Sequence, residues 1–202
     1  MSDAKTRIAF FGHDAGDAAI RRRVAGLQAT GCAVTGFMMR RGPDEPRAWE
    51  NVDLGRTRDA AYWQRLTAIV RGGRIARKQA ELLRAADLII ARNLDMLIVA
   101  MNAKRRLRLQ APVVYECLDI HHLLTRSDPL GGLLRRIEKR LIRATALLVY
   151  SSPAFEREFF KRCYGGLYTP FLLENRLVDT AALPPRPSAV TAPATPLRLG
   201  WV

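Results

Sequence analysis

Short apolar runs alternate with helical stretches along most of this chain. The runs have strand length, and the stretches between them repeat apolar residues at the spacing of one buried helix face. Strands that alternate with helices form a parallel sheet with right-handed crossovers and helices on its faces. The sequence therefore predicts an α/β fold with a doubly wound, Rossmann-like parallel sheet. The expected strands are residues 7–11, 33–39, 52–54, 88–91, 113–115, 146–150 and 171–173, and the expected helices are residues 17–30, 59–86, 94–109, 133–144 and 152–164.

Two sequence signals refine the helix boundaries. Ser152 followed by Pro153 is a strong start for the last helix, because serine caps a helix and proline suits its first position. Gly72 and Gly73 interrupt the long second helix, so we expect a kink or a break there.

Residues 111–122 (APVVYECLDIHH) form the stretch with the most reactive side chains. The apolar run of residues 113–115 is typical of a buried parallel strand. It is followed directly by a polar stretch that contains Glu116, Asp119, His121 and His122. In an open α/β sheet, ligands bind at the carboxyl ends of the strands. We therefore expect this strand to deliver polar groups to a ligand site.

Polar residues also follow most of the other expected strands. Because the carboxyl ends of parallel strands lie at one edge of the sheet, we expect these residues to form one rim suited to a polyhydroxyl or phosphorylated ligand. The candidate residues of this rim are Gly12, His13, Asp14, Gly16, Arg40, Arg41, Arg92, Asn93, Asp119, His121, His122, Ser151, Ser152, Glu174 and Asn175.

The chain carries a formal net charge of +14, mostly from arginine. Guanidinium groups bind phosphate bidentately, so this charge favours phosphate groups, anionic lipid headgroups or nucleic acid as partners. A solvated, arginine-rich surface accounts for the same charge. Nucleic acid is not expected as a partner, since the sequence shows no recognised nucleic-acid motif and no aromatic stacking platform.

Cysteine content and hydropathy indicate the compartment. Cys32, Cys117 and Cys163 are odd in number and far apart, which argues for reduced thiols and against a disulfide framework or a zinc site. No apolar run approaches the roughly 18 residues of a membrane span. The short apolar run near the N-terminus does not resemble a secretory signal. We therefore expect a cytoplasmic protein.

Three other chemistries fit the residues less well. Gly12 and Gly16 have the glycine spacing of a dinucleotide-binding loop, and Arg40-Arg41 could hold the 2′-phosphate of NADP, but the third glycine position is Ala18. A Ser-His-Asp hydrolase lacks the G-x-S-x-G sequence. A metal site of Asp119, His121 and His122 would need both histidines on one ion, whereas adjacent side chains of an extended segment point in opposite directions.

The composition changes after residue 179. Residues 180–196 are rich in proline and alanine, which is typical of an extended linker. Residues 197–202 (LRLGWV) again read as a strand. We therefore expect one domain over residues 1–179, a linker over residues 180–196, and the first strand of a further domain over residues 197–202.

Several segments together resemble the N-terminal half of a GT-B glycosyltransferase of the large retaining group called family four. Residues 136–160 (RIEKRLIRATALLVYSSPAFEREFF) resemble its glutamate-bearing helix, its strand that ends in serine and its capped helix. Residues 171–179 resemble the strand and turn that close the first domain, and LRLGWV resembles the opening strand of the second. The segments GHDAGDAAIRRRVAGLQATG and ARNLDMLIVA are similar to bacterial exopolysaccharide sugar transferases of the succinoglycan type.

The resemblance implies a two-domain enzyme that transfers a sugar from a nucleotide-sugar to a glycan or lipid-linked acceptor, with retention and without a metal or other cofactor. The N-terminal domain would receive the acceptor, and the loop of residues 12–16 would line the acceptor and diphosphate region. His121 or His122 would match the family's histidine that contacts the reacting sugar and would hydrogen-bond the hexose or orient the acceptor hydroxyl. The donor-binding carboxylates belong to the second domain of the family, so residues 1–202 alone are expected not to catalyse sugar transfer.

The resemblance also gives the basic helices a candidate role. Acceptors of this family are often lipid-linked, and arginine-rich helices could dock on the inner face of the cytoplasmic membrane. Two alternatives remain: a non-catalytic Rossmann-like module that binds an anionic surface or partner, and an NADP-binding protein.

Overall fold

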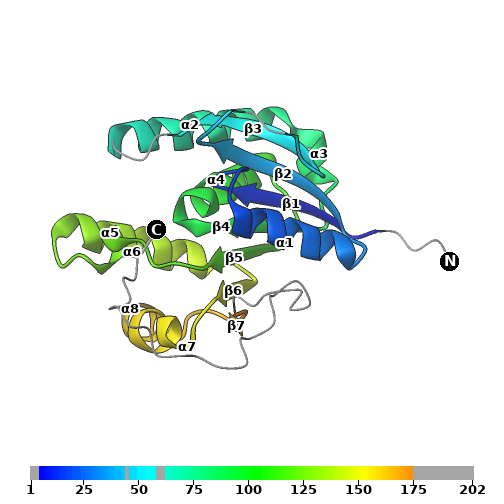
Figure 1. Cartoon of the computed structure of the whole chain (residues 1–202). Coiled ribbons are helices and arrows are strands. Elements are labelled where there is room, and N and C mark those ends of the chain that lie inside the picture. Colours follow the sequence, from blue (N-terminus) through cyan, green and yellow to red (C-terminus); the bar gives the residue numbers. More distant parts are fainter. Residues whose placement is uncertain (1–4, 44–45, 58–61, 175–202) are drawn as a thin grey trace, which may run out of the picture.

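The computed structural model describes residues 5–43, 46–57 and 62–174. Within them the chain forms a seven-stranded sheet in which every neighbouring pair is parallel, with the order β3-β2-β1-β4-β5-β6-β7 (Figure 1). The predicted doubly wound parallel sheet is therefore confirmed. The strands are β1 (Arg7–Gly12), β2 (Ala33–Arg40), β3 (Glu50–Arg56), β4 (Leu88–Arg92), β5 (Val113–Cys117), β6 (Leu147–Tyr150) and β7 (Pro170–Leu172).

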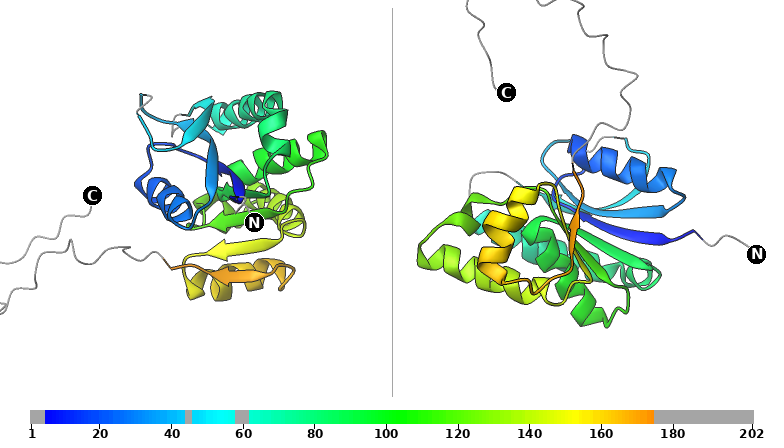
Figure 2. Two further views of the ribbon diagram at one scale, coloured as in Figure 1. Left: turned by 90° about the vertical axis from the view of Figure 1, so that its right-hand side faces the viewer. Right: turned by 90° about the horizontal axis from the view of Figure 1, so that it is seen from below.

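The helices cover the two faces of the sheet unequally. In the left view of Figure 2, α1 lies on one face, whereas α2, α4 and α6 lie on the other. The helical elements are α1 (Ala18–Ala29), α2 (Tyr62–Lys78), α3 (Ala80–Arg84), α4 (Asn93–Leu107), α5 (His122–Thr125), α6 (Pro129–Ile142), α7 (Pro153–Phe155), the π-helical η1 (Glu156–Phe160) and α8 (Lys161–Tyr164).

Each face has its own core, because successive side chains of a strand alternate between faces. On the α1 face, Ile20 and Val24 of the helix pack on Phe10, Met38 and other strand residues. The larger core on the opposite face joins the strands to α4, α6, η1 and α8. The α4 helix contributes most to it, with six buried residues over its length.

Two predicted element boundaries in the first half of the chain were wrong. The long second helix breaks at Gln79, where φ is −96° and ψ is 44°, and not at Gly72-Gly73. Gly72 instead permits close packing, since a Cβ there would lie 3.1 Å from Cε of Met39. The predicted short strand at 52–54 extends over Glu50–Arg56, because it pairs with β2 along most of its length.

The segment after β5 contains more helix than the sequence predicted. The short helix α5 occupies part of the expected loop. The next helix, α6, begins at Pro129 and not near residue 133, because the Asp128 carboxylate accepts a hydrogen bond from the Gly131 N–H (2.9 Å) and Pro129 suits the first turn.

The proposed linker and the strand of residues 197–202 lie outside the described residues, as does Asn175. Within the described part, no helix is both long enough and apolar enough to cross a membrane.

Candidate functional site

The carboxyl ends of all seven strands lie at one edge of the sheet, from which α1, α4 and α5 begin (Figure 1). The strand order reverses between β1 and β4, and the helices that follow these two strands cover opposite faces. Such a switch point is where open α/β sheets form a ligand crevice. Those predicted rim residues that the structure describes lie along this edge.

The loop between β1 and α1 is held in shape by Asp14. Its Oδ1 accepts hydrogen bonds from the N–H groups of Gly16 (3.0 Å) and Arg41 (3.4 Å), so it ties the loop to the end of β2. Gly12 precedes the loop in a crowded position, since a Cβ there would lie 3.0 Å from Cδ1 of Ile20. These contacts within the protein therefore fix the shape of the loop of residues 12–16.

His13 and Asp17 connect this loop to the start of α1. Asp17 is the N-cap residue, and its Oδ1 accepts hydrogen bonds from the N–H groups of Ala19 (2.7 Å) and Ile20 (3.0 Å). Its other oxygen lies 3.6 Å from Nε2 of His13. The hydrogen bond from His13, with these backbone bonds, holds the pKa of Asp17 well below its usual range. His13 therefore stabilises the start of α1 through its interaction with the N-cap residue Asp17.

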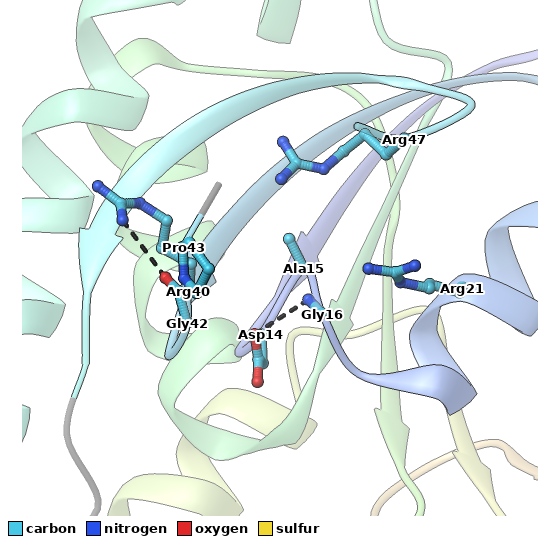
Figure 3. Close-up of a pocket in the computed structure, with 8 residues that line it drawn as sticks. All are labelled: Asp14, Ala15, Gly16, Arg21, Arg40, Gly42, Pro43 and Arg47. Atoms are coloured by element: carbon cyan, nitrogen blue, oxygen red, sulfur yellow. Dashed lines mark hydrogen bonds between the residues drawn. The ribbon is translucent and has the colours of Figure 1, made fainter. Parts of the chain in front are cut away.

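A small pocket of about 120 Å³ opens between this loop and the loop that follows β2 (Figure 3). Three of its lining residues are arginines, namely Arg21 from α1, Arg40 from the end of β2, and Arg47. Sequence reasoning identified Arg40 but missed Arg21 and Arg47, because they follow no strand and lie far apart in the sequence. The remaining lining residues are Asp14, Ala15, Gly16, Gly42 and Pro43.

The predicted rim residues Arg92 and Asn93 are largely covered by the protein and contact neighbouring elements of the site. Arg92 is only 5% exposed, and its Nε lies 3.8 Å from Oε2 of Glu116. Burial lowers the pKa of Arg92, and the Glu116 carboxylate opposes that effect. Asn93 adopts a left-handed conformation (φ 68°), and its Oδ1 accepts a hydrogen bond from the N–H of Met96 (3.2 Å) at the start of α4.

Glu116 lies beneath α1 and does not project from the strand end as the sequence predicted. It is fully buried, and its Oε1 lies 2.9 Å from Nε of Arg23 on α1. The side chain belongs to the α1 face because Glu116 is two positions from Val114 along β5. Its carboxylate therefore joins β5 to α1 and to the end of β4.

The two histidines after β5 lie side by side, which corrects the expectation that they point in opposite directions. Their ring centroids are 4.4 Å apart, with the planes at 30°. His121 is the N-cap residue of α5 and His122 is its first residue, so the chain turns into a helix between them and does not continue as an extended segment. Nδ1 of His121 accepts a hydrogen bond from the N–H of Leu123 (3.2 Å), whereas His122 is exposed.

The remaining rim residues have mixed roles. Ser151 donates a hydrogen bond from Oγ to the carbonyl of Leu118 (2.9 Å) and so fixes the segment after β5. Ser152 caps the helix that follows β6, as predicted. Asp119 and Glu174 are exposed, after β5 and β7 respectively. Asp119 and His122 thus lie at the same strand end with their side chains toward solvent.

No group of three or more His, Cys, Asp or Glu residues within the described ranges is arranged to hold a metal ion. The three cysteines, all of them described, are free, and burial raises the pKa of Cys117 well above that of an ordinary thiol.

One curated protein is similar to nearly the whole chain. The succinoglycan biosynthesis protein ExoL of Rhizobium meliloti (strain 1021) is 39% identical over 203 residues, which cover 96% of this chain and 50% of that protein. The chain therefore spans about half the length of the curated relative that it matches. No model of a known protein family matches the chain.

Solved structures show the same fold in another protein. The sucrose-phosphate synthase of Thermosynechococcus elongatus superposes with a TM-score of 0.63 at 14% identity, over 84% of this chain and 48% of that one. A shorter chain of the same synthase superposes equally well, with a TM-score of 0.63 at 13% identity, over 83% of this chain and 88% of that one. The chain is thus similar in sequence to a succinoglycan biosynthesis protein along nearly its whole length, and its fold is one that occurs in a sucrose-phosphate synthase.

Proposed function

We propose that this chain is the acceptor-side domain of a GT-B glycosyltransferase that builds a cell-surface polysaccharide. The observation that carries the proposal is the 39% identity to a succinoglycan biosynthesis protein along 96% of the chain. The fold, shared with a sucrose-phosphate synthase, supports the same class of reaction. The enzyme would transfer a sugar from a nucleotide-sugar to a glycan or lipid-linked acceptor, with retention and without a metal.

We assign the donor site to a second domain that corresponds to the other half of ExoL, because this chain matches 50% of that protein. In this arrangement the strand-end edge faces the donor domain, and the acceptor lies between them. Charge develops on the leaving nucleoside diphosphate during transfer, and the groups that stabilise it belong to the second domain. The 202 residues by themselves are therefore expected to show no turnover with any nucleotide-sugar.

Of the two adjacent histidines, we assign the substrate contact to His122. His121 already uses Nδ1 to cap α5, whereas His122 is exposed at the same strand end. An imidazole there can hydrogen-bond the transferred sugar or orient the acceptor hydroxyl. His13, Asp14, Asp119, Ser151 and Glu174 complete the proposed acceptor side.

The test is a chimera in which this chain replaces the matching half of ExoL in a Rhizobium meliloti strain that lacks ExoL. Secreted polysaccharide is measured, together with the amount of soluble chimera. We expect the chimera to restore polysaccharide, and His122→Ala to reduce it by about 100-fold or more if the histidine assists proton transfer. The control is Thr125→Ala on the same short helix. A well-folded chimera that restores nothing would contradict the proposal.

A second candidate role, docking on an anionic membrane, is favoured by the surface of α6. Leu133, Arg136 and Arg140 follow one another at helical spacing and are all exposed, and Leu130 in the first turn is also exposed. Exposed leucines next to arginines on one helix are typical of a helix that lies in the headgroup region of an anionic membrane. This helix begins beside the candidate site (Figure 1), so a membrane-held acceptor would be within reach.

Vesicle sedimentation tests the docking role. We expect the chain to sediment with vesicles that contain phosphatidylglycerol and to remain in solution with vesicles of phosphatidylcholine alone. The double variant Leu130→Ser/Leu133→Ser should lose most of this binding, whereas Leu167→Ser, an exposed leucine elsewhere, should not. Equal binding to neutral vesicles would rule out the electrostatic contribution.

A further inference from the structure

The short helix α5, which carries His122, depends on other elements for its position. It has only four residues, whereas isolated helices shorter than about 12–15 residues are marginal in water. Its residues Leu123 and Leu124 are buried and hold it against the protein on one side. The last carbonyl groups of a helix have no partner within the helix. Contacts with neighbouring elements must therefore fix the C-terminal end of α5.

Arg135 of α6 supplies hydrogen bonds at that end. Its Nη1 donates to the carbonyl of Leu124 (2.6 Å) and to the carbonyl of Arg126 (2.6 Å), which is the C-cap residue of α5. Hydrogen bonds from a charged donor are roughly twice as strong as those between neutral groups. Arg135 is also partly buried, so its guanidinium is not fully solvated. Arg135 therefore joins α6 to the last turn of α5.

Gly131, at the start of α6, packs against one of the same carbonyl groups. A Cβ at this position would overlap the carbonyl oxygen of Arg126. At Gly132, the next residue, a Cβ would meet no heavy atom within 4 Å. The turn that follows α5 therefore fits closely against α6 at Gly131.

The other end of this segment is held by side chains at the ends of β5 and β6. Ser151 donates a hydrogen bond from Oγ to the carbonyl of Leu118 (2.9 Å), and the Cys117 thiol donates one to the carbonyl of Asp119 (3.4 Å). Residues 118–126 are thus held at both ends, with Arg135 at the C-terminal end.

We propose that Arg135 is a positioning residue, which fixes the place of the His122 imidazole by holding the C-terminal end of α5. His122 is exposed, so the backbone of α5 and the stacking on His121 decide where its ring lies. A misplacement of about 1 Å at a substrate contact can lower a rate by about 100-fold. The effect on sugar transfer rests on the proposed function, whereas the fixed position of His122 does not.

Nuclear magnetic resonance of the 202-residue chain tests the position of His122. Arg135→Met keeps an apolar stem and removes every hydrogen-bond donor. We expect this variant to shift the His122 ring resonances, because the stacking on His121 changes. Amide exchange at Leu124, whose N–H donates to the His121 carbonyl (2.8 Å), should accelerate by about 10-fold or more. Arg135→Lys, which keeps a charged donor on a long stem, should partly restore both signals.

Arg143→Met is the matched control, because Arg143 is exposed at the end of the same helix and the substitution removes the same charge. It should leave the His122 resonances unchanged. The proposal is overturned if Arg135→Met is folded and leaves these resonances unchanged, or if Arg143→Met shifts them as much. If Arg135→Met does not fold, the polar variant Arg135→Gln replaces it in the comparison.

A second pair of variants moves the same turn and leaves Arg135 in place. Gly131→Ala should displace the Arg126 carbonyl and shift the His122 resonances, whereas Gly132→Ala should not. Unchanged His122 resonances in a folded Gly131→Ala variant would contradict the claim that this turn sets the position of His122.

The consequence for sugar transfer is tested in the ExoL chimera. We expect Arg135→Met to lower secreted polysaccharide per amount of soluble chimera by about 10-fold or more, with partial recovery in Arg135→Lys. In a His122→Ala chimera the same substitution should have little further effect, because no imidazole remains to be positioned. An equal further loss in that background would overturn the positioning role. Failure of the unmutated chimera would count against the proposed function, whereas the resonances test the position of His122 independently.

Discussion

Glu138 is completely buried, although the same helix carries two exposed arginines, Arg136 and Arg140. Its carboxylate accepts hydrogen bonds from the hydroxyl groups of Tyr115 (2.6 Å) and Tyr164. These bonds join β5, α6 and α8 within the larger core. Burial nevertheless raises the pKa of Glu138 above its usual value, because it disfavours the charged form more than the two hydroxyls favour it.

This raised pKa predicts that Glu138 makes the folded state less stable as pH rises. When the pKa of a carboxyl is higher in the folded state than in the unfolded state, the group stabilises the folded state fully below its unfolded-state pKa, which is about 4.3 for glutamate. This stabilisation is lost as pH rises through the folded-state pKa. A tenfold difference in proton affinity between the folded and unfolded chain corresponds to about 1.4 kcal/mol. Glu138→Gln removes the titration but keeps polar partners for both tyrosines. We therefore expect the variant to gain stability relative to wild type between pH 5 and pH 8, as measured by urea unfolding.

Glu156→Gln provides the contrast for this experiment. The hydrogen bond from the Tyr150 hydroxyl lowers the pKa of Glu156, so this carboxylate contributes stability above its unfolded-state pKa and loses it as pH falls. Relative to wild type, Glu156→Gln should therefore lose stability toward neutral pH. The same pH trend for both variants would contradict the assignment for Glu138.

Residue types at the strand ends could be predicted from the sequence, but their roles could not. Polar residues after each strand do lie at one edge of the sheet, because parallel strands require it. Glu116 and Arg92 turn inward to each other, and His121 caps a helix that the sequence did not reveal. These outcomes depend on partners from other elements, which spacing along the chain does not identify.

At the scale of elements, helix ends with a local chemical signal were predicted well. The helix after β6 starts at Pro153 behind its Ser152 cap and ends at Gly165, whose φ of 63° suits glycine. The break between α2 and α3 was misplaced because glycine was interpreted as a helix breaker. Gly72 instead packs closely against Met39 and Leu54 of the neighbouring strands, which is a tertiary effect.

At the scale of the whole molecule, the alternation of strands and helices was sufficient to predict a parallel sheet but not its strand order. The order places β1 between β2 and β4, so the helices after β1 and β4 cover opposite faces. Among the described residues, α1 supplies all the helix residues in the smaller core, whereas several helices share the larger one. The face beneath α1 therefore depends on a single helix.

The buried carboxylate of Glu116 links α1 to the middle of the sheet. It forms ion pairs with Arg23 on α1 and with Arg92 at the end of β4. Glu116→Gln removes the negative charge and leaves Arg92, which is 5% exposed, without its ion pair. Removing one partner of a buried ion pair costs about 3–5 kcal/mol, and Arg23 reduces that cost because it can reach water. We therefore expect amide hydrogen exchange to accelerate by about 10-fold or more in α1, while α4 on the opposite face keeps its protection.

The control is Glu138→Gln on the opposite face, which should leave the amide exchange rate of α1 unchanged. Equal acceleration in α1 and α4 would mean that the substitution destabilises the whole sheet and that Glu116 does not hold α1 specifically.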